Sequence, residues 1–127
     1  MNPERRYRES VNRYLPRDVY HQGMGGVATN GTPDSYYEGS FNSLWVEWKW
    51  TNSKNPVLIP EPSALQKRWL TRAYSNGVNV AVICGCPLRG YVFPGFSWEL
   101  RHTTGARLVG DRKAIAAWIT SQVIEDG

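Results

Sequence analysis

The chain has 127 residues, a mass of 14.4 kDa and a formal net charge of +4. This length suits one domain with one hydrophobic core, so we expect residues 1–127 to fold as a single unit. Hydrophobic residues make up 41% and charged residues 20% of the chain, values that exclude a disordered, collagen-like or coiled-coil protein. The excess of Lys and Arg favours a polyanionic partner such as nucleic acid.

No segment is typical of membrane insertion or secretion. The longest apolar run, 78–84, is interrupted by Asn79 and is far shorter than the roughly 20 residues of a membrane-spanning helix. The charged residues of the N-terminus have no apolar stretch behind them, unlike a secretory signal. We therefore expect a cytoplasmic protein with no membrane partner.

The first predicted element is an amphipathic helix that begins at Pro3 and ends before Pro16. Its apolar stripe has helical spacing. The stripe contains Glu4, Tyr7, Val11, Tyr14 and Leu15. Glu4 is a carboxylate in line with apolar side chains, which marks it as a candidate functional residue.

Three strands are predicted next, over 17–22, 35–37 and 44–50, with a glycine-rich loop at 23–31 between the first two. The loop lacks the Gly-Lys-Ser/Thr of a P-loop. The strand at 44–50 is the strongest, because β-branched and aromatic residues alternate along it. Side chains on one of its faces are Leu44, Val46, Trp48 and Trp50, and those on the other are Trp45, Glu47 and Lys49.

The rest of the chain predicts a second helix at 63–74 capped by Ser63, a buried strand at 78–85, a further short strand at 90–96, and a last helix from Asp111 to Ile124. The buried stripe of the second helix is expected to contain Leu65, Gln66, Trp69, Leu70 and Ala73. The predicted order is α-β-β-β-α-β-β-α, an α/β domain with a mixed central sheet flanked by helices.

The candidate chemistry lies in Pro33-Asp34 and Glu47-Trp48-Lys49. Glu47 and Lys49 share one side of their strand, and the preceding strand can bring Asp34 beside them. Such hard oxygen ligands suit Mg²⁺ or Mn²⁺. An ion of this kind can activate water and stabilise a leaving oxygen, while a lysine neutralises developing charge.

These residues and their order resemble the signature of the PD-(D/E)XK nuclease superfamily, and more closely a stand-alone VRR-NUC domain, the virus-type replication-repair nuclease. The resemblance covers about residues 4–84. The matching stretches are the first helix with Glu4 and Tyr14-Leu15, Gly31-Thr32-Pro33-Asp34, Trp45-Val46-Glu47-Trp48-Lys49, and Gln66-Lys67-Arg68-Trp69-Leu70 followed by Gly77 and an apolar strand. It implies a restriction-endonuclease-like core.

The resemblance also implies roles for single residues. Asp34, Glu47 and the backbone carbonyl of Trp48 would be metal ligands, and Lys49 would be the catalytic lysine. Glu4 would hold metal-bound water, and Gln66 would line the site. The activity implied is cleavage of branched DNA, including four-way junctions, by a homodimer.

Several residues have alternative interpretations. Glu4 can instead stabilise the positive helix N-terminus, Glu9 is a weaker candidate for the same catalytic role, and Gln66 can complete a capping box with Ser63. The two histidines, His21 and His102, are expected to be solvated or packed. The two cysteines, Cys84 and Cys86, are expected to be buried free thiols, because a C-x-C pair with no second cluster is short of zinc ligands.

Phosphate contacts are expected from basic side chains on the two helices and in the loop after the strongest strand. The candidates are Arg5, Arg8, Lys54, Lys67, Arg68 and Arg72. Tyr36, Tyr37 or an exposed Trp is a candidate for stacking on unpaired bases. The sequence therefore predicts a metal-dependent DNA endonuclease, with a Holliday junction resolvase preferred. A nuclease for flaps, single strands or linear duplex, and a non-cleaving nucleic-acid-binding protein on the same fold, are the alternatives.

Overall fold

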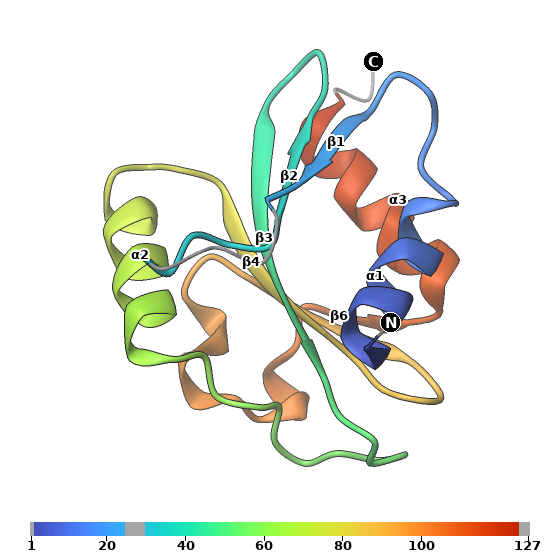
Figure 1. Ribbon diagram of the computed structural model, residues 1–127, viewed down its shortest axis with the longest axis vertical. Coiled ribbons are helices and arrows are strands. Elements are labelled where there is room, and N and C mark those ends of the chain that lie inside the picture. The colour runs from blue at the N-terminus through green and yellow to red at the C-terminus, as the bar shows by residue number, and fades with distance from the viewer. Residues whose placement is uncertain (1, 25–29, 125–127) are drawn as a thin grey trace.

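The computed structural model describes residues 2–24 and 30–124 and contains one six-stranded sheet between two helical layers (Figure 1). The strands are β1 (Tyr20–Gly23), β2 (Ser35–Glu38), β3 (Ser43–Trp50), β4 (Val80–Gly85), β5 (Gly90–Pro94) and β6 (Leu108–Gly110). The helices are α1 (Pro3–Asn12), α2 (Ala64–Ser75) and α3 (Arg112–Val123), with short 3₁₀ turns η1 (Ser97–Leu100) and η2 (Thr103–Gly105). The predicted α/β fold with a mixed sheet is confirmed.

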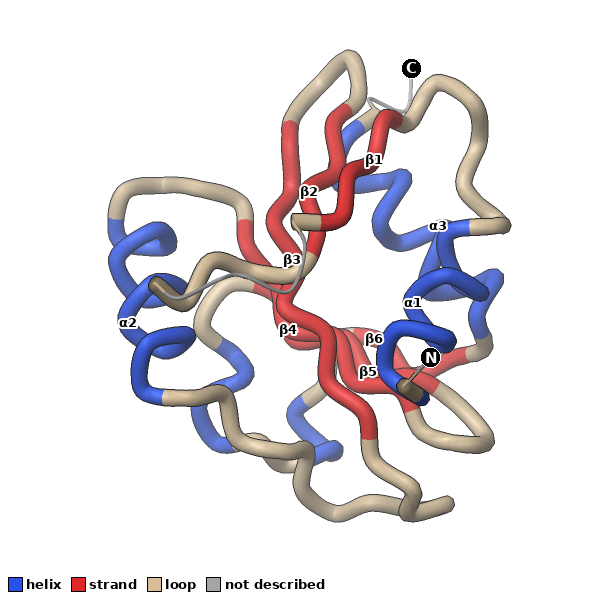
Figure 2. Tube along the Cα trace, in the orientation of Figure 1, coloured by secondary structure: helices blue, strands red, loops and turns tan. Residues whose placement is uncertain are grey.

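The strands lie in the sheet in the order in which they occur along the chain. Among the strands of the described residues, β3 and β4 run parallel and are connected by α2, and the other neighbouring pairs are antiparallel. Helices α1 and α3 lie on one side of the sheet and α2 on the other, as Figure 2 shows. None of the helices in residues 2–24 and 30–124 is long and apolar enough to cross a membrane.

Strand β3 separates the two cores of the domain. Leu44, Val46 and Trp48 belong to the buried cluster that includes side chains of α1 and α3. Trp45, on the opposite face of the strand, packs against the cluster under α2. The alternation predicted for 44–50 is therefore confirmed.

Helix α1 is shorter than predicted. It ends at Asn12, because the amides of Tyr14 and Leu15 bond to the carbonyls three residues back, at 3.0 and 3.1 Å, and so form tight turns in place of a further helical turn. Tyr7 and Val11 are buried as expected, but Tyr14 is 56% exposed. The predicted helix boundary at Pro16 and the predicted place of Tyr14 on the buried stripe were therefore wrong.

The end regions of the sheet also differ from the prediction. β1 begins at Tyr20 rather than residue 17, and all four of its residues are exposed. β6 was not predicted, because a three-residue edge strand is defined by its pairing with β5 and not by its own pattern. Of the predicted glycine-rich loop, residues 25–29 lie outside the described part of the chain.

Helices α2 and α3 begin where predicted. Ser63 and Asp111 are their N-caps, and each side chain accepts a hydrogen bond from the backbone three residues on, at 3.2 and 2.8 Å. On α2, Leu70 and Ala73 are buried but Leu65 is 43% exposed, so its predicted burial was wrong. Cys84 and Cys86 are buried free thiols, as expected.

Candidate active site

The candidate site lies where β2 leaves the edge of β3. The register pairs Ser35, the first residue of β2, with Val46, so β3 continues from Glu47 to Trp50 without a β2 partner. Asp34 immediately precedes β2 and takes the place of that partner. Its Oδ2 accepts a hydrogen bond from the backbone N–H of Trp48 at 2.9 Å.

The backbone carbonyl of Trp48 points to the same open edge. The N–H groups of Trp45 and Thr51 bond to backbone carbonyls of Asn79 and Gly85, each at 3.0 Å, on the β4 side. Residues along a strand direct their N–H and C=O alternately to the two neighbouring strands, so those of Trp48 are directed away from β4. The predicted carbonyl ligand and Asp34 therefore share one edge of the strand.

Glu47 is a buried carboxyl, only 2% exposed. Its Oε2 accepts a hydrogen bond from Gln66 Nε2 at 3.0 Å and lies 3.6 Å from Lys49 Nζ. Its Oε1 is also buried and accepts no hydrogen bond from the described residues, while Asp34 lies close enough to accept one from the protonated carboxyl of Glu47. A buried carboxyl oxygen without a donor is costly, and such an oxygen is free to bind a cation.

Burial and neighbouring charges shift the pKa of Glu47. Burial first, and then the charge of Asp34, raise the pKa of Glu47 from 4.5 to about 9, while Lys49 opposes the rise. Without an added positive charge, Glu47 is therefore protonated at neutral pH. A cation bound between the two carboxylates would oppose both causes of the shift, because its positive charge stabilises the ionised form of Glu47.

Gln66 makes the contacts that both of its interpretations require. Its Oε1 accepts from the backbone N–H of Ser63 at 2.8 Å, which completes the capping box of α2, and also from Lys49 Nζ at 2.9 Å. Its Nε2 donates to Glu47. The amide thus fixes the lysine and the carboxyl relative to the start of α2.

Glu4 reaches the same region from α1, on the other side of the sheet. Burial first, and then the negative charge of Asp34, raise its pKa, and the positive charges of Lys49 and Arg8 lower it. Glu9, the weaker alternative, instead forms an ion pair with Arg5 at 3.2 Å.

The loop before Asp34 is anchored on α2. Gly31 has a φ of +83°, and a Cβ there would lie 2.2 Å from the backbone oxygen of Leu65. Only glycine fits this approach without strain. Sequence reasoning missed this support, as it missed Ser35, whose buried hydroxyl accepts from Trp48 Nε1 at 3.1 Å; the only signals were a glycine and a serine beside the Pro-Asp motif.

The residues present fit a divalent cation bound by hard oxygen ligands. Asp34, the unpartnered Glu47 Oε1 and the Trp48 carbonyl supply such oxygens from one edge of β3. Within the described ranges, no three side chains of the His, Cys, Asp and Glu types form a metal-binding group. The predicted set has only two direct side-chain ligands, Asp34 and Glu47; the Trp48 carbonyl and a water held by Glu4 would complete it.

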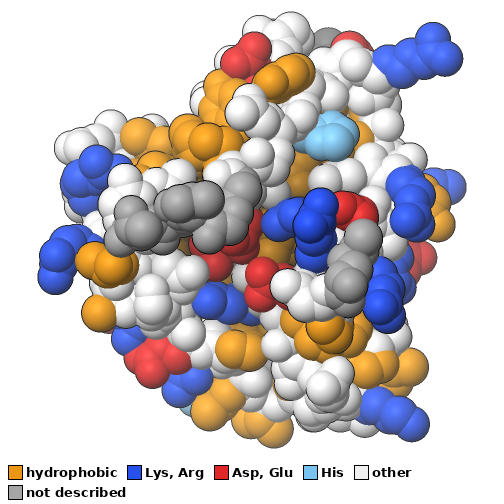
Figure 3. Space-filling model, in the orientation of Figure 1, with side chains coloured by type: hydrophobic (Ala, Val, Ile, Leu, Met, Phe, Trp, Pro, Cys, Tyr) orange, Lys and Arg blue, Asp and Glu red, His pale blue; other side chains and the backbone are white. Residues whose placement is uncertain are grey.

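The basic candidates lie on two sides of the site. On α1, Arg8 is partly buried and Arg5 is exposed. Those on and near α2 are Lys67, which pairs with Glu61, the exposed Arg68, and Arg72, whose guanidinium lies 5.1 Å from the Trp69 ring centroid. The face in Figure 3 shows acidic side chains near its centre with Lys and Arg on either side of them. Lys54 is exposed in the loop after β3, and contact of these residues with DNA stays a prediction.

The histidines and tyrosines divide into accessible and inaccessible side chains. His21 and His102 are exposed, as expected for solvated histidines. Tyr37 is fully buried and donates to Asn12 Oδ1 at 2.7 Å, so its proposed stacking on bases was wrong. Tyr36 remains partly exposed.

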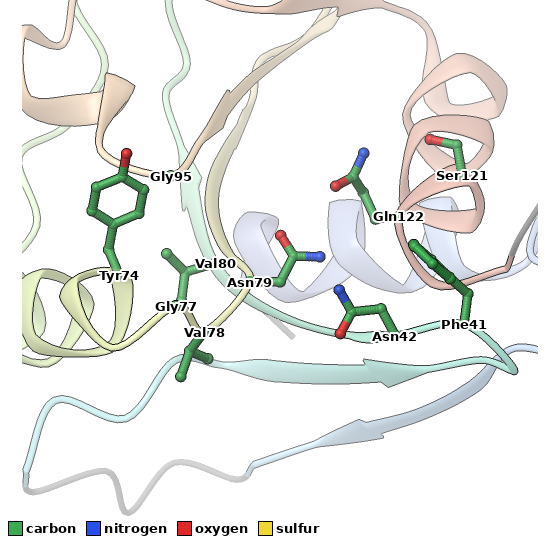
Figure 4. A pocket seen from close by; sticks show the side chains of 10 residues that line it. All are labelled: Phe41, Asn42, Tyr74, Gly77, Val78, Asn79, Val80, Gly95, Ser121 and Gln122. Atoms are coloured by element: carbon green, nitrogen blue, oxygen red, sulfur yellow. The ribbon is translucent and has the colours of Figure 1, made fainter.

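A pocket of about 430 Å³ lies elsewhere in the fold, between the β2–β3 turn, the start of β4 and the end of α3. Figure 4 shows Phe41 and Asn42, Tyr74 and Asn79, and Gln122 among the side chains that line it. None of the candidate site residues lines this pocket. Its volume therefore adds nothing to the assignment of the site.

Comparisons with known proteins bear on the fold. No family model and no curated protein sequence matches the chain. A solved structure of Hjc from Archaeoglobus fulgidus, a Holliday junction resolvase from an archaeal hyperthermophile, is similar with a TM-score of 0.60 and 18% sequence identity. The match covers 91% of this chain and 98% of that one. The chain therefore has the fold of that resolvase over nearly its whole length.

Proposed function

We propose that this protein is a divalent-metal-dependent endonuclease that cleaves branched DNA, with the four-way junction as its preferred substrate. One observation carries the proposal. A buried carboxyl with a raised pKa, Glu47, lies beside Lys49 and the Asp34 edge, on a fold also found in an archaeal Holliday junction resolvase. The finer resemblance, to a VRR-NUC domain encoded by a virus and acting in the cytoplasm of its host, is part of the same proposal and rests on the motifs alone.

Asp34, Glu47 and the Trp48 carbonyl would hold Mg²⁺ or Mn²⁺, with Glu4 acting through water. When bound, the ion supplies Lewis-acid polarisation of the phosphate and lowers the pKa of water. The chain's own residues position the reaction. Lys49, fixed by Gln66 at 2.9 Å, neutralises charge that develops on the phosphate, and its ammonium can orient the attacking water.

A homodimer is part of the proposal, because two symmetric nicks in a four-way junction require two sites, and a two-fold axis supplies them. The basic residues on α1 and α2 would contact phosphates on either side of the cut strand. Phosphate contacts carry no sequence information by themselves, which agrees with recognition of DNA shape rather than of a base sequence.

The test is cleavage of end-labelled four-way junction, flap, splayed-arm and linear duplex DNA with Mg²⁺ or Mn²⁺. Asp34→Ala and Lys49→Ala are compared with wild type, and Lys113→Ala on the exposed side of α3 is the matched control. The proposal predicts paired symmetric nicks in the junction, lost in the first two variants and kept in the control. DNA binding in EDTA with no cleavage of any substrate would instead indicate a non-cleaving binding protein.

A further inference from the structure

Three aromatic rings form a continuous surface next to the candidate site. We call Tyr36, Trp45 and Trp69 the aromatic ridge. The ring centroids of Tyr36 and Trp45 are 4.9 Å apart, and those of Trp45 and Trp69 are 5.3 Å apart. All three side chains are partly exposed. Trp45 and Trp69 also pack against the core under α2, so part of each ring is buried and part is accessible.

The ridge is built on the same two elements as the candidate site. Trp45 lies two residues before Glu47, on the same face of β3, and so is displaced from it by roughly 7 Å along the strand. Trp69 lies three residues after Gln66, on the same face of α2. Gln66 contacts Glu47, and Trp69 contacts Trp45. The contact between Trp45 and Trp69 is therefore the neighbour of the contact between Glu47 and Gln66, along both β3 and α2.

The open end of the ridge carries positive charge. The Arg72 guanidinium lies over the Trp69 ring, at 5.1 Å from its centroid. A small pocket of about 220 Å³ beside it is lined by Asn30, Arg68, Trp69 and Arg72. Flat rings together with guanidinium groups are the combination that stacks on bases while holding the backbone of single-stranded nucleic acid.

We propose that the aromatic ridge and Arg72 bind unpaired bases of the DNA strand that the candidate site cuts. This rests on the proposed function and deepens it: next to the cut, at the branch point of a junction or flap, the stack of base pairs is interrupted, so a base can leave its partner and reach the ridge. A fully paired duplex keeps its bases stacked on each other and offers the ridge no free base face. The phosphates would then lie toward Arg68 and Arg72.

The test measures binding without metal, so that it does not depend on cleavage. Fluorescence anisotropy in EDTA compares a fully paired duplex with a duplex of equal length that contains an internal bubble, both of DNA. The variants are Trp69→Leu and Trp45→Leu, which keep an apolar side chain under α2, and Arg72→Gln, which changes only an exposed side chain. Trp118→Leu, a partly buried tryptophan on α3 packed against the other core, is the matched control.

The proposal predicts that wild type binds the bubble more tightly than the duplex. Each tryptophan substitution should weaken bubble binding by at least about fivefold and duplex binding much less, and the bubble should quench tryptophan fluorescence of wild type. Trp118→Leu should leave both affinities unchanged. Equal affinity of wild type for both DNAs, or equal losses on both in the ridge variants, would overturn it.

The outcome for the ridge is separate from the outcome for catalysis. Metal-dependent cleavage without a preference for binding the bubble would overturn the proposed role of the aromatic ridge and leave the proposed nuclease activity in place. A bubble preference lost in the ridge variants, without cleavage in Mg²⁺ or Mn²⁺, would support the ridge and contradict the nuclease. Should a tryptophan variant fail to fold, Arg72→Gln tests the same contact: because Arg72 lies over Trp69, this substitution should weaken binding of the bubble more than binding of the duplex, and equal losses on both would overturn the proposal.

Discussion

The two faces of β3 contrast sharply, although their residues alternate along one strand. On the α1 and α3 side, Leu44, Val46 and Trp48 are fully buried among apolar neighbours. On the α2 side, the same strand carries a buried carboxyl with one unpartnered oxygen, and a lysine 3.6 Å from its other oxygen. One face stabilises the fold, and the other costs free energy that a bound cation would recover. Substitutions on the α2 face are expected to affect cleavage, and substitutions on the other face are expected to affect stability.

The largest effect is expected on the α2 face and on activity. Lys49→Met should lower the rate of metal-dependent cleavage by about 10²–10³-fold, because it removes the ammonium group that neutralises the negative charge developing on the phosphate. The melting temperature should change little, because the lysine is partly exposed. Single-turnover cleavage and thermal unfolding measure the two effects. A rate within a few-fold of wild type would remove Lys49 from the mechanism.

On the α1 and α3 face of β3, a substitution is expected to lower stability and leave cleavage unchanged. Leu44→Ala should lower the free energy of unfolding by about 2–5 kcal/mol, because it leaves a cavity in a fully buried cluster. Cleavage measured well below the melting temperature should be unchanged. Chemical denaturation checks the first statement. Loss of cleavage by folded Leu44→Ala would show that the two faces are not independent.

The helix caps give a smaller and closely matched comparison. Ser63→Ala and Asp111→Ala each remove one capping side chain, from α2 and α3, and each should cost about 1 kcal/mol of stability. Only Ser63→Ala should also slow cleavage, by a few-fold. It keeps the bond from the Ser63 backbone N–H to Gln66 Oε1, but it removes the Ser63 Oγ acceptor that holds the backbone of Gln66 at the start of α2, from which Gln66 contacts Lys49 and Glu47. Equal cleavage rates in the two variants would mean that the cap does not position the site.

A further comparison changes only the pH. Because the pKa of metal-free Glu47 is raised to about 9, a cation must displace its proton at lower pH. The metal concentration that gives half-maximal cleavage should therefore fall by up to about tenfold per pH unit as the pH rises towards 9. A metal requirement that does not change between neutral pH and pH 9 would contradict this account of Glu47.

The sequence predicted what local patterns encode. The alternation along 44–50 placed Glu47 and Lys49 on one face and the apolar residues on the other, and Ser63 marked the start of α2. It also left the role of Gln66 open between cap and site, and the structure shows that one amide oxygen serves both.

The features that were missed depend on contacts between distant segments. β6 exists only as a partner of β5, and the exposed edge strand β1 has no apolar pattern to set its bounds. Gly31 is required by the backbone of Leu65, and the ridge pairs residues 45 and 69 across two elements. Tyr37 alternates onto the buried face of β2, where a polar partner, Asn12, satisfies its hydroxyl.

The most direct test of the central claim is thermal unfolding of wild type and Glu47→Gln, with and without Mn²⁺, near neutral pH. The unfolded chain releases the Glu47 proton near pH 4.5 and the folded chain near pH 9, so between these values the carboxyl lowers stability increasingly as the pH rises. We expect metal-free Glu47→Gln to be more stable than wild type by on the order of 1–3 kcal/mol, and Mn²⁺ to raise the melting temperature of wild type far more than that of the variant. The exposed control Glu99→Gln should behave as wild type. Equal melting temperatures of wild type and Glu47→Gln, with no response of either to Mn²⁺, would contradict it.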